Sequence, residues 1–248
     1  MKLPHSLDRS IWIRAPREIV FGYFSDSVRW AAWWGAGSTI DARPGGALLI
    51  RYPNGTEVAG EVLAVAAPEK IQFTYGYKSG QPVAEGTTLV TVTLAEERGG
   101  TRLELRHEFA DPAVRDMHVQ GWRYQLSVFA NVVADVVFSG AEASVDEWFA
   151  AWAEPDAVRR AERFAAVALP EVVFQDRWSC LRGREDLCAH AGAAQKFMPG
   201  VVLKRKGPIR QCQGTVLAEW SAGEKMTGTN VFVFGPDGRI ESVTGFAL

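Results

Sequence analysis

The chain has 248 residues, of which 47% are hydrophobic, and its formal net charge is −2 at pH 7. This length suits two domains of ordinary size, and the apolar content is sufficient for two buried cores. Basic and acidic residues are mixed along the chain rather than gathered into a basic field, which argues against nucleic acid as a partner.

The cysteines and the first residues of the chain bear on its compartment. Cys180, Cys188 and Cys212 are odd in number and lack C-x-x-C spacing, so we expect reduced thiols and no metal site. Because nucleotide and phosphate motifs are also missing from the sequence, we expect no cofactor. The N-terminus lacks the apolar segment of a signal peptide, and no window approaches the roughly 20 apolar residues of a membrane span. We therefore expect a cytoplasmic protein without a membrane partner.

The first half of the chain has the pattern of a β-meander that follows two short helices. Residues 10–14 alternate as a strand, and Pro16 then opens a helix at a position where the missing N–H of proline costs nothing. A short aromatic helix is expected from Trp30 to Trp34. Clusters of Gly, Pro and Asn separate the following β-prone runs at hairpin spacing, which predicts an antiparallel sheet.

Two of these runs show which side chains point inward. Apolar or aromatic residues occupy the odd positions of both 71–77 and 103–109, so His107 is expected on the buried face. After Pro112 the apolar spacing becomes helical, with Trp122 and Phe129 on one stripe. One long helix is therefore expected to pack over the sheet.

The second half is expected to begin with a new helix after Ser139-Gly140-Ala141. Ser144 and Glu147 have the Ser-x-x-Glu spacing of a capping box at the start of that helix. A second helix restarts at Asp156, a strand follows at 172–176, and a third helix is expected from about Arg184 to Phe197. Four β-prone runs around 202, 209, 218 and 231 precede a last strand at 240–246.

The first half, taken in this order, is similar to a known superfamily. The residues that carry the similarity are Ile13, Ala15-Pro16, Val20-Phe21, Trp33-Trp34, Arg43-Pro44-Gly45-Gly46, Gly60-Glu61-Val62, the run 67–74, Gly100-Thr101-Arg102-Leu103 and Gly121-Trp122. They resemble the START-related (SRPBCC) helix-grip superfamily, in the branch named for activators of the heat-shock protein ATPase. The resemblance implies that residues 1–139 form an antiparallel sheet with a long C-terminal helix, and that this domain binds an apolar molecule.

The second half resembles a different group. The similarity rests on the run 148–152, Asp156, Phe164, Asp176, Gly183-Arg184, the run 230–234 and the run 237–240. These residues are similar to the SnoaL-like and ketosteroid-isomerase-like proteins, which share the nuclear transport factor 2-like fold. The resemblance implies that residues 140–248 form an α+β cone around a pocket, so the whole chain is expected to be an α+β protein of two domains.

The same resemblance implies roles for individual residues. The general base of the isomerases follows the first strand, where this chain has Asp176. Their two oxyanion donors are a tyrosine and a protonated aspartate, and this chain has Trp148 and Asn230 in those places. The asparagine still donates a hydrogen bond, whereas an indole N–H lies elsewhere, which argues against steroid isomerisation. His190, on the apolar face of its helix, is expected to shuttle a proton.

Each candidate also has a purely structural interpretation. Asp176 can cap a turn or pair with a neighbouring arginine, and His190 and His107 can be satisfied core residues. Most of the large aromatic residues are expected in the cores, with a few touching a ligand. The candidate ligand-binding residues of the second half are Trp148, Trp152, Trp178, Phe197, Trp220 and Phe232. Those of the first half are Tyr75, Tyr77, His107 and Trp122, with Arg51 if its strand alternates as expected.

Two functions of different classes follow from these patterns. The first is acid/base chemistry on an apolar small molecule, such as isomerisation, cyclisation or dehydration, with Asp176 as base, His190 as shuttle and Asn230 polarising an oxygen. The second is a non-catalytic binding or stress-associated protein in which both cavities hold hydrophobic ligands or one face contacts a partner. An open sheet in the second half also makes a homodimer plausible.

Overall fold

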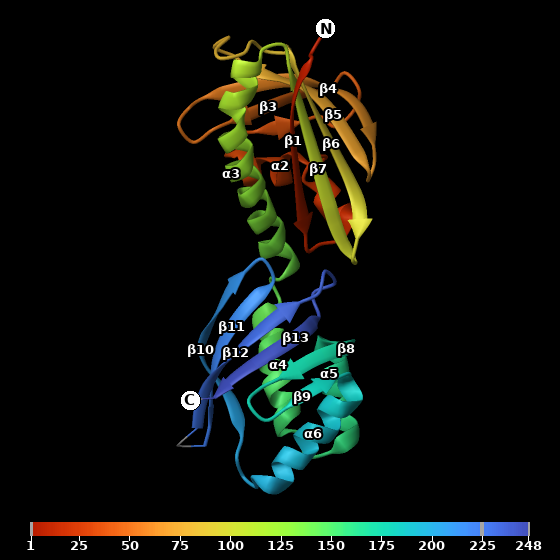
Figure 1. Ribbon diagram of the computed structural model, residues 1–248, viewed down its shortest axis with the longest axis vertical. Coiled ribbons are helices and arrows are strands. Elements are labelled where there is room, and N and C mark those ends of the chain that lie inside the picture. The colour runs from red at the N-terminus through yellow and green to blue at the C-terminus, as the bar shows by residue number, and fades with distance from the viewer. Residues whose placement is uncertain (1, 224–225, 248) are drawn as a thin grey trace. The chain divides into compact units, whose positions relative to one another are not determined.

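The computed structural model describes residues 2–223 and 226–247 and has an α+β architecture. Contacts divide the chain into two compact units, Met1–Val133 and Ala134–Leu248. Each unit has its own sheet, as Figure 1 shows. Within the described residues no single helix is long and apolar enough to cross a membrane, although the consecutive helices Pro112–Val137 and Ala141–Ala153 together pass the same test of length and composition.

The first unit is built on a seven-stranded sheet in which every neighbouring pair is antiparallel, as expected. The strand order across the sheet is β1-β7-β6-β5-β4-β3-β2. The strands are β1 (His5–Ile13), β2 (Thr39–Ile40), β3 (Ala47–Arg51), β4 (Glu57–Ala66), β5 (Lys70–Tyr77), β6 (Thr88–Glu97) and β7 (Gly100–Phe109).

Three helices complete this unit: α1 (Arg17–Gly22), α2 (Ser27–Trp34) and α3 (Pro112–Val137). Helix α1 begins directly after Pro16, and the Asp26 carboxylate caps α2 by accepting the Arg29 backbone N–H. The predicted stripe of α3 is buried and packs on α2, where the Trp122 and Trp34 rings lie 5.7 Å apart. The alternation in β5 and β7 is confirmed, because Phe73, Leu105 and His107 are all buried.

The second unit is a six-stranded sheet whose helices gather on one side of it (Figure 1). The strand order is β10-β11-β12-β13-β8-β9, and the pair β13–β8 is parallel. The strands are β8 (Ala168–Gln175), β9 (Cys180–Arg182), β10 (Leu203–Cys212), β11 (Thr215–Ala222), β12 (Met226–Phe234) and β13 (Ile240–Ala247). The helices are α4 (Ala141–Ala153), α5 (Ala157–Val167) and α6 (Arg184–Phe197).

Two predictions about this unit were wrong. Helix α4 does not start at a capping box: Gly140 is its N-cap, and the Ser144 backbone N–H already donates to the Gly140 carbonyl inside the first turn. The β-prone runs around 202 and 209 are not separate strands, because both fall at or within β10, whose register shifts between Lys206 and Arg210. A bulge absorbs the interruption that the sequence suggested.

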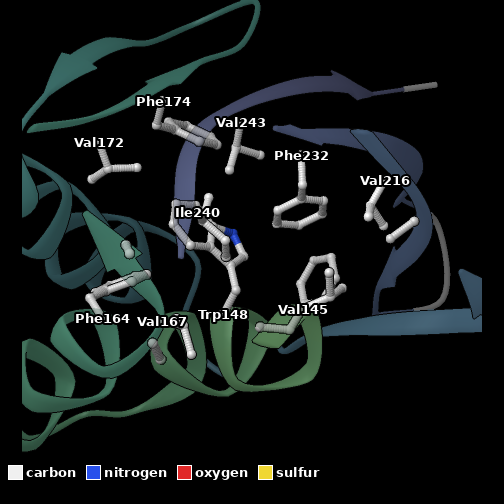
Figure 2. Packing of buried hydrophobic residues seen from close by; sticks show 14 of the residues in the cluster. Val145, Trp148, Phe164, Val167, Val172, Phe174, Val216, Phe232, Ile240 and Val243 are labelled. Carbon is white, nitrogen blue, oxygen red and sulfur yellow. The ribbon is translucent and has the colours of Figure 1, made fainter. Parts of the chain in front are cut away.

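The core of the second unit lies between the sheet and the helices. Figure 2 shows Trp148 of α4 reaching toward the sheet among Phe164, Phe232 and Ile240. The predicted start of α5 is confirmed, since the Asp156 carboxylate accepts the Val158 and Arg159 backbone N–H groups. Such a cap satisfies donors that the first turn of a helix leaves unpaired.

Candidate functional site

The second unit contains a cavity of about 440 Å³ that its sheet shares with α4 and α6. Helix α4 contributes Trp152 and α6 contributes His190. Other lining residues come from the strands and from the loop between β8 and β9. The described residues that line it are Trp152, Phe174, Asp176, Trp178, Ser179, His190, Ala193, Ala194, Phe197, Met198, Leu203, Trp220, Met226, Asn230, Gly245 and Ala247.

Apart from three tryptophan indoles, the polar side chains among the described lining residues are four: Asp176, Ser179, His190 and Asn230. Three of them are the residues that the sequence singled out for chemistry. All four therefore share one cavity, and the other described residues of its lining are apolar or aromatic. A few polar groups in an otherwise apolar lining are typical of small-molecule sites, because they fix the orientation of the ligand.

Asp176 lies in the four-residue turn that joins β8 to β9. Its backbone N–H donates to the Ser179 carbonyl at 3.0 Å, and its Oδ1 accepts the Trp178 backbone N–H at 2.8 Å. Asp176 therefore does cap a turn. No ion pair joins it to a described arginine, and its second carboxylate oxygen has no hydrogen bond to any described residue.

His190 is bonded to Ser179, a residue that the sequence did not indicate. The Ser179 Oγ and the His190 Nε2 lie 3.0 Å apart, and the imidazole ring also contacts Trp152, with ring centroids 5.8 Å apart. Because a hydroxyl both donates and accepts, either the Ser179 Oγ or the His190 Nε2 can be the donor of this hydrogen bond. The position of Ser179 follows from the hairpin, which returns β9 beside β8 and so turns the serine toward α6.

The side-chain amide of Asn230 is held in one orientation by Trp220. The indole Nε1–H can only donate, and it lies 2.9 Å from the Asn230 Oδ1, so the amide nitrogen must be on the other side. Asn230 is buried, and its Nδ2 group is left as the donor for another partner.

Gly245 leaves space between the Asn230 and Asp176 side chains. A Cβ atom at Gly245 would lie 3.2 Å from the Asn230 Oδ1 and 3.3 Å from the Asp176 Cβ. The two side chains therefore flank one point on adjacent strands, since Asn230 pairs with Gly245 and β13 runs beside β8. The Asn230 side-chain amide and the Asp176 side chain therefore approach each other beside Gly245, and both line the cavity.

Some aromatic candidates of this unit line the cavity, and others are buried in the core. Trp152 and Trp220 line the cavity from within, whereas Trp178 and Phe197 are 70% and 86% exposed and lie at its mouth. Trp148 and Phe232 are fully buried and do not line the cavity. Their placement as ligand-binding residues was wrong, because α4 turns Trp148 into the packed layer shown in Figure 2 rather than toward the open space.

The first unit has its own cavity, of about 400 Å³, between α2, α3 and the sheet. Three of its candidates, Tyr75, Tyr77 and Trp122, line it. Residues that the sequence did not indicate are Trp34, Tyr52 and His118. The full lining is Ala32, Trp33, Trp34, Gly35, Tyr52, Pro53, Tyr75, Tyr77, Met117, His118, Gly121, Trp122, Tyr124, Gln125 and Val128.

His107 does not line this cavity but forms a buried hydrogen-bonded chain beside it. The Trp122 Nε1–H donates to the His107 Nδ1 at 2.9 Å, so the ring proton is on Nε2, which lies 2.8 Å from the Thr88 Oγ1. The Thr88 hydroxyl in turn donates to the Tyr75 carbonyl at 2.6 Å. Burial and the nearby His118 hold the pKa of His107 well below its usual value, so the ring is neutral. Both ring nitrogens are thus bonded within the core, as its structural interpretation expects.

Arg51 also lies outside the cavity. Its side chain is half-exposed and pairs with Glu57 at 2.7 Å, so the strand directs the guanidinium to solvent. Tyr52, the next residue, takes the inward position instead, and its hydroxyl lies 3.2 Å from that of Tyr75. Burial raises the pKa of Tyr52 to about 12, so its hydroxyl keeps its proton.

These features can be compared with the arrangement expected for each unit. A long helix packed across an antiparallel sheet over an aromatic cavity is the arrangement that the resemblance to the START-related helix-grip superfamily implies for the first unit, and a sheet with helices around a pocket is the one that the SnoaL-like resemblance implies for the second. Residues 14–134 match the family described as "Activator of Hsp90 ATPase homolog 1-like protein". Comparison with curated proteins found no match.

Several solved structures are similar to parts of this chain. A protein from Chromobacterium violaceum shares 26% identity with a TM-score of 0.44, covering 53% of this chain and 98% of its own. The Aha1 protein from Colwellia psychrerythraea, a dimer in solution, shares 13% identity with a TM-score of 0.46, covering 52% of this chain and 96% of its own. A SnoaL-like family protein from Agrobacterium tumefaciens shares 22% identity with a TM-score of 0.41, covering 43% of this chain and 95% of its own.

Proposed function

We propose that the second unit binds a small, mostly apolar molecule that carries an oxygen atom. The observation that carries this proposal is the gathering of Asp176, Ser179, His190 and Asn230 in one cavity whose other described lining residues are apolar or aromatic. The cavity volume of about 440 Å³ is within the range of small-molecule sites. The Asn230 amide group supplies a hydrogen-bond donor for the oxygen of the ligand.

The chemistry that best fits this set of groups is proton transfer next to a carbonyl group. Asp176 takes a proton from the carbon beside the carbonyl, and the Asn230 Nδ2–H stabilises the negative charge that develops on the oxygen. The proton then returns to another carbon or to the same one. The His190–Ser179 pair, with its shared proton, exchanges protons between the ligand and solvent.

A two-stage experiment tests this proposal. Native mass spectrometry of freshly purified protein is expected to detect a retained apolar molecule. Proton abstraction is then measured by NMR as deuterium incorporation beside the carbonyl of 2-tetralone, an apolar ketone, in D₂O. Asp176→Asn is expected to reduce the exchange rate by about 10²- to 10⁴-fold, the usual contribution of a general base.

The matched control is Asp186→Asn, which alters an exposed carboxylate at the start of α6 that does not line the cavity. It is expected to leave the exchange rate unchanged. Retained ligand without any catalysed exchange would support a non-catalytic binding protein instead of an enzyme. A cavity that neither retains a ligand nor accelerates exchange would refute the proposal.

A further inference from the structure

The cavity of the first unit is lined by aromatic rings to an unusual degree. Trp34, Tyr52, Tyr75, Tyr77 and Trp122 all contribute, whereas its aliphatic side chains are few. The lining contains no Asp, Glu, Lys or Arg side chain among the residues that the structure describes. A ligand in this cavity therefore meets π systems rather than fixed charges or a uniform aliphatic wall.

Three pairs of neighbouring rings around this cavity stand at steep angles to each other. The interplanar angle is 88° between Trp34 and Tyr52 and 75° between Trp34 and Trp122. Tyr75 and Tyr77 are also at 88°. A planar ligand stacks on only one ring of such a corner. A compact, roughly spherical group can instead approach several rings at once.

Two polar atoms of the lining have no hydrogen-bond partner in the described structure: the Trp34 Nε1 and the His118 Nε2. His118 is 7% exposed, and its Nδ1 is bonded to the Val114 carbonyl at 2.8 Å, so Nε2 carries the lone pair of a neutral ring. Burial lowers the pKa of His118, which favours this neutral form. Trp34 offers an unused donor and His118 an unused acceptor, and a ligand hydroxyl can satisfy either.

These features identify the chemical class of the ligand. Aromatic rings attract a cation through their negatively charged faces, and quaternary ammonium groups are the ligands that aromatic cages characteristically bind. A quaternary ammonium has no N–H donor, so it needs no carboxylate partner when it leaves water. We propose that the cavity of the first unit binds a small quaternary ammonium compound that carries a hydroxyl group.

The proposal is tested by comparing choline with 3,3-dimethyl-1-butanol on the full chain by isothermal titration calorimetry. The two molecules have the same shape and the same hydroxyl, and differ in the positive charge. Choline is expected to bind at least about tenfold more tightly, because cation–π attraction acts on it alone. Equal affinities, tighter binding of the alcohol, or no saturable binding of choline would overturn the proposal.

Variants of Tyr77, a lining residue at the end of β5, locate the interaction. Tyr77→Phe keeps the ring and is expected to retain the preference for choline, whereas Tyr77→Leu removes the ring and is expected to reduce that preference several-fold. The alcohol serves as the folding control, since its affinity should change little in either variant. Trp178→Leu, which removes a ring from the cavity of the other unit, is expected to leave choline binding unchanged. An unaltered preference in Tyr77→Leu would refute the assignment.

Discussion

The substitution Thr88→Val tests the buried chain that holds His107. The Thr88 hydroxyl accepts from the His107 Nε2–H at 2.8 Å and donates to the Tyr75 carbonyl at 2.6 Å. Thr88 and His107 are 1% and 0% exposed, so water cannot replace the lost partner. Valine has nearly the same shape as threonine, and the substitution therefore changes the hydrogen bonds without opening a cavity.

The expected loss follows from the two groups left unsatisfied. Each buried donor or acceptor without a partner costs about 1–3 kcal/mol, so we expect Thr88→Val to reduce the free energy of unfolding by about 2–6 kcal/mol. Thr88→Ser is the control, because it keeps the hydroxyl and loses one methyl group, at a cost of about 1 kcal/mol.

Urea unfolding followed by NMR measures this loss within the first unit alone. The indole N–H resonances of Trp30 and Trp122 report on that unit, which matters because a chain with two units need not unfold in a single step. A loss in Thr88→Val no greater than that in Thr88→Ser would refute the reasoning, since it would show that the hydroxyl bonds contribute nothing.

Two further predictions concern pH and the second cavity. Burial lowers the pKa of His107, so below about pH 6.5 the His107 ring is protonated in the unfolded chain but stays neutral in the folded chain. The free energy of unfolding should therefore fall as the pH decreases below about 6.5. An NMR titration should show the His107 ring still neutral at pH 6, and a ring already protonated there would contradict this. Gly245→Ala places a Cβ atom 3.2 Å from the Asn230 Oδ1, so it should weaken retention of a bound ligand in native mass spectra while costing about 1–3 kcal/mol of stability. Unchanged retention would show that this space is not used.

Much of the fold follows from local patterns. The 3.6-residue spacing of Trp122 and Phe129 predicted α3, and the alternation around His107 predicted its buried face. The bounds of α6 agree with the predicted helix from Arg184 to Phe197. These patterns are reliable because periodicity records which side of an element is buried, and this depends little on the identity of the packing partner.

Local patterns were less reliable at element boundaries. The Ser144 and Glu147 spacing suits a capping box, but the turn between α3 and α4 is short, so the helix already begins at Ala141. The interruption near Gly207 is absorbed as a bulge in β10 because β11 pairs with the strand on both sides of it. In both places a tertiary or neighbouring contact outweighed the local signal.

The sequence by itself determined the two-part α+β organisation and the inward faces, and it singled out Asp176, His190 and Asn230. Only the tertiary structure decided which inward residues line a cavity and which fill a core. Trp148 and Trp152 lie on the same helix, yet the first is packed in the core and the second borders open space. The pairing of His190 with Ser179 likewise depends on how a hairpin meets α6. Periodicity specifies a direction for each side chain, whereas a cavity depends on what several distant elements leave unfilled.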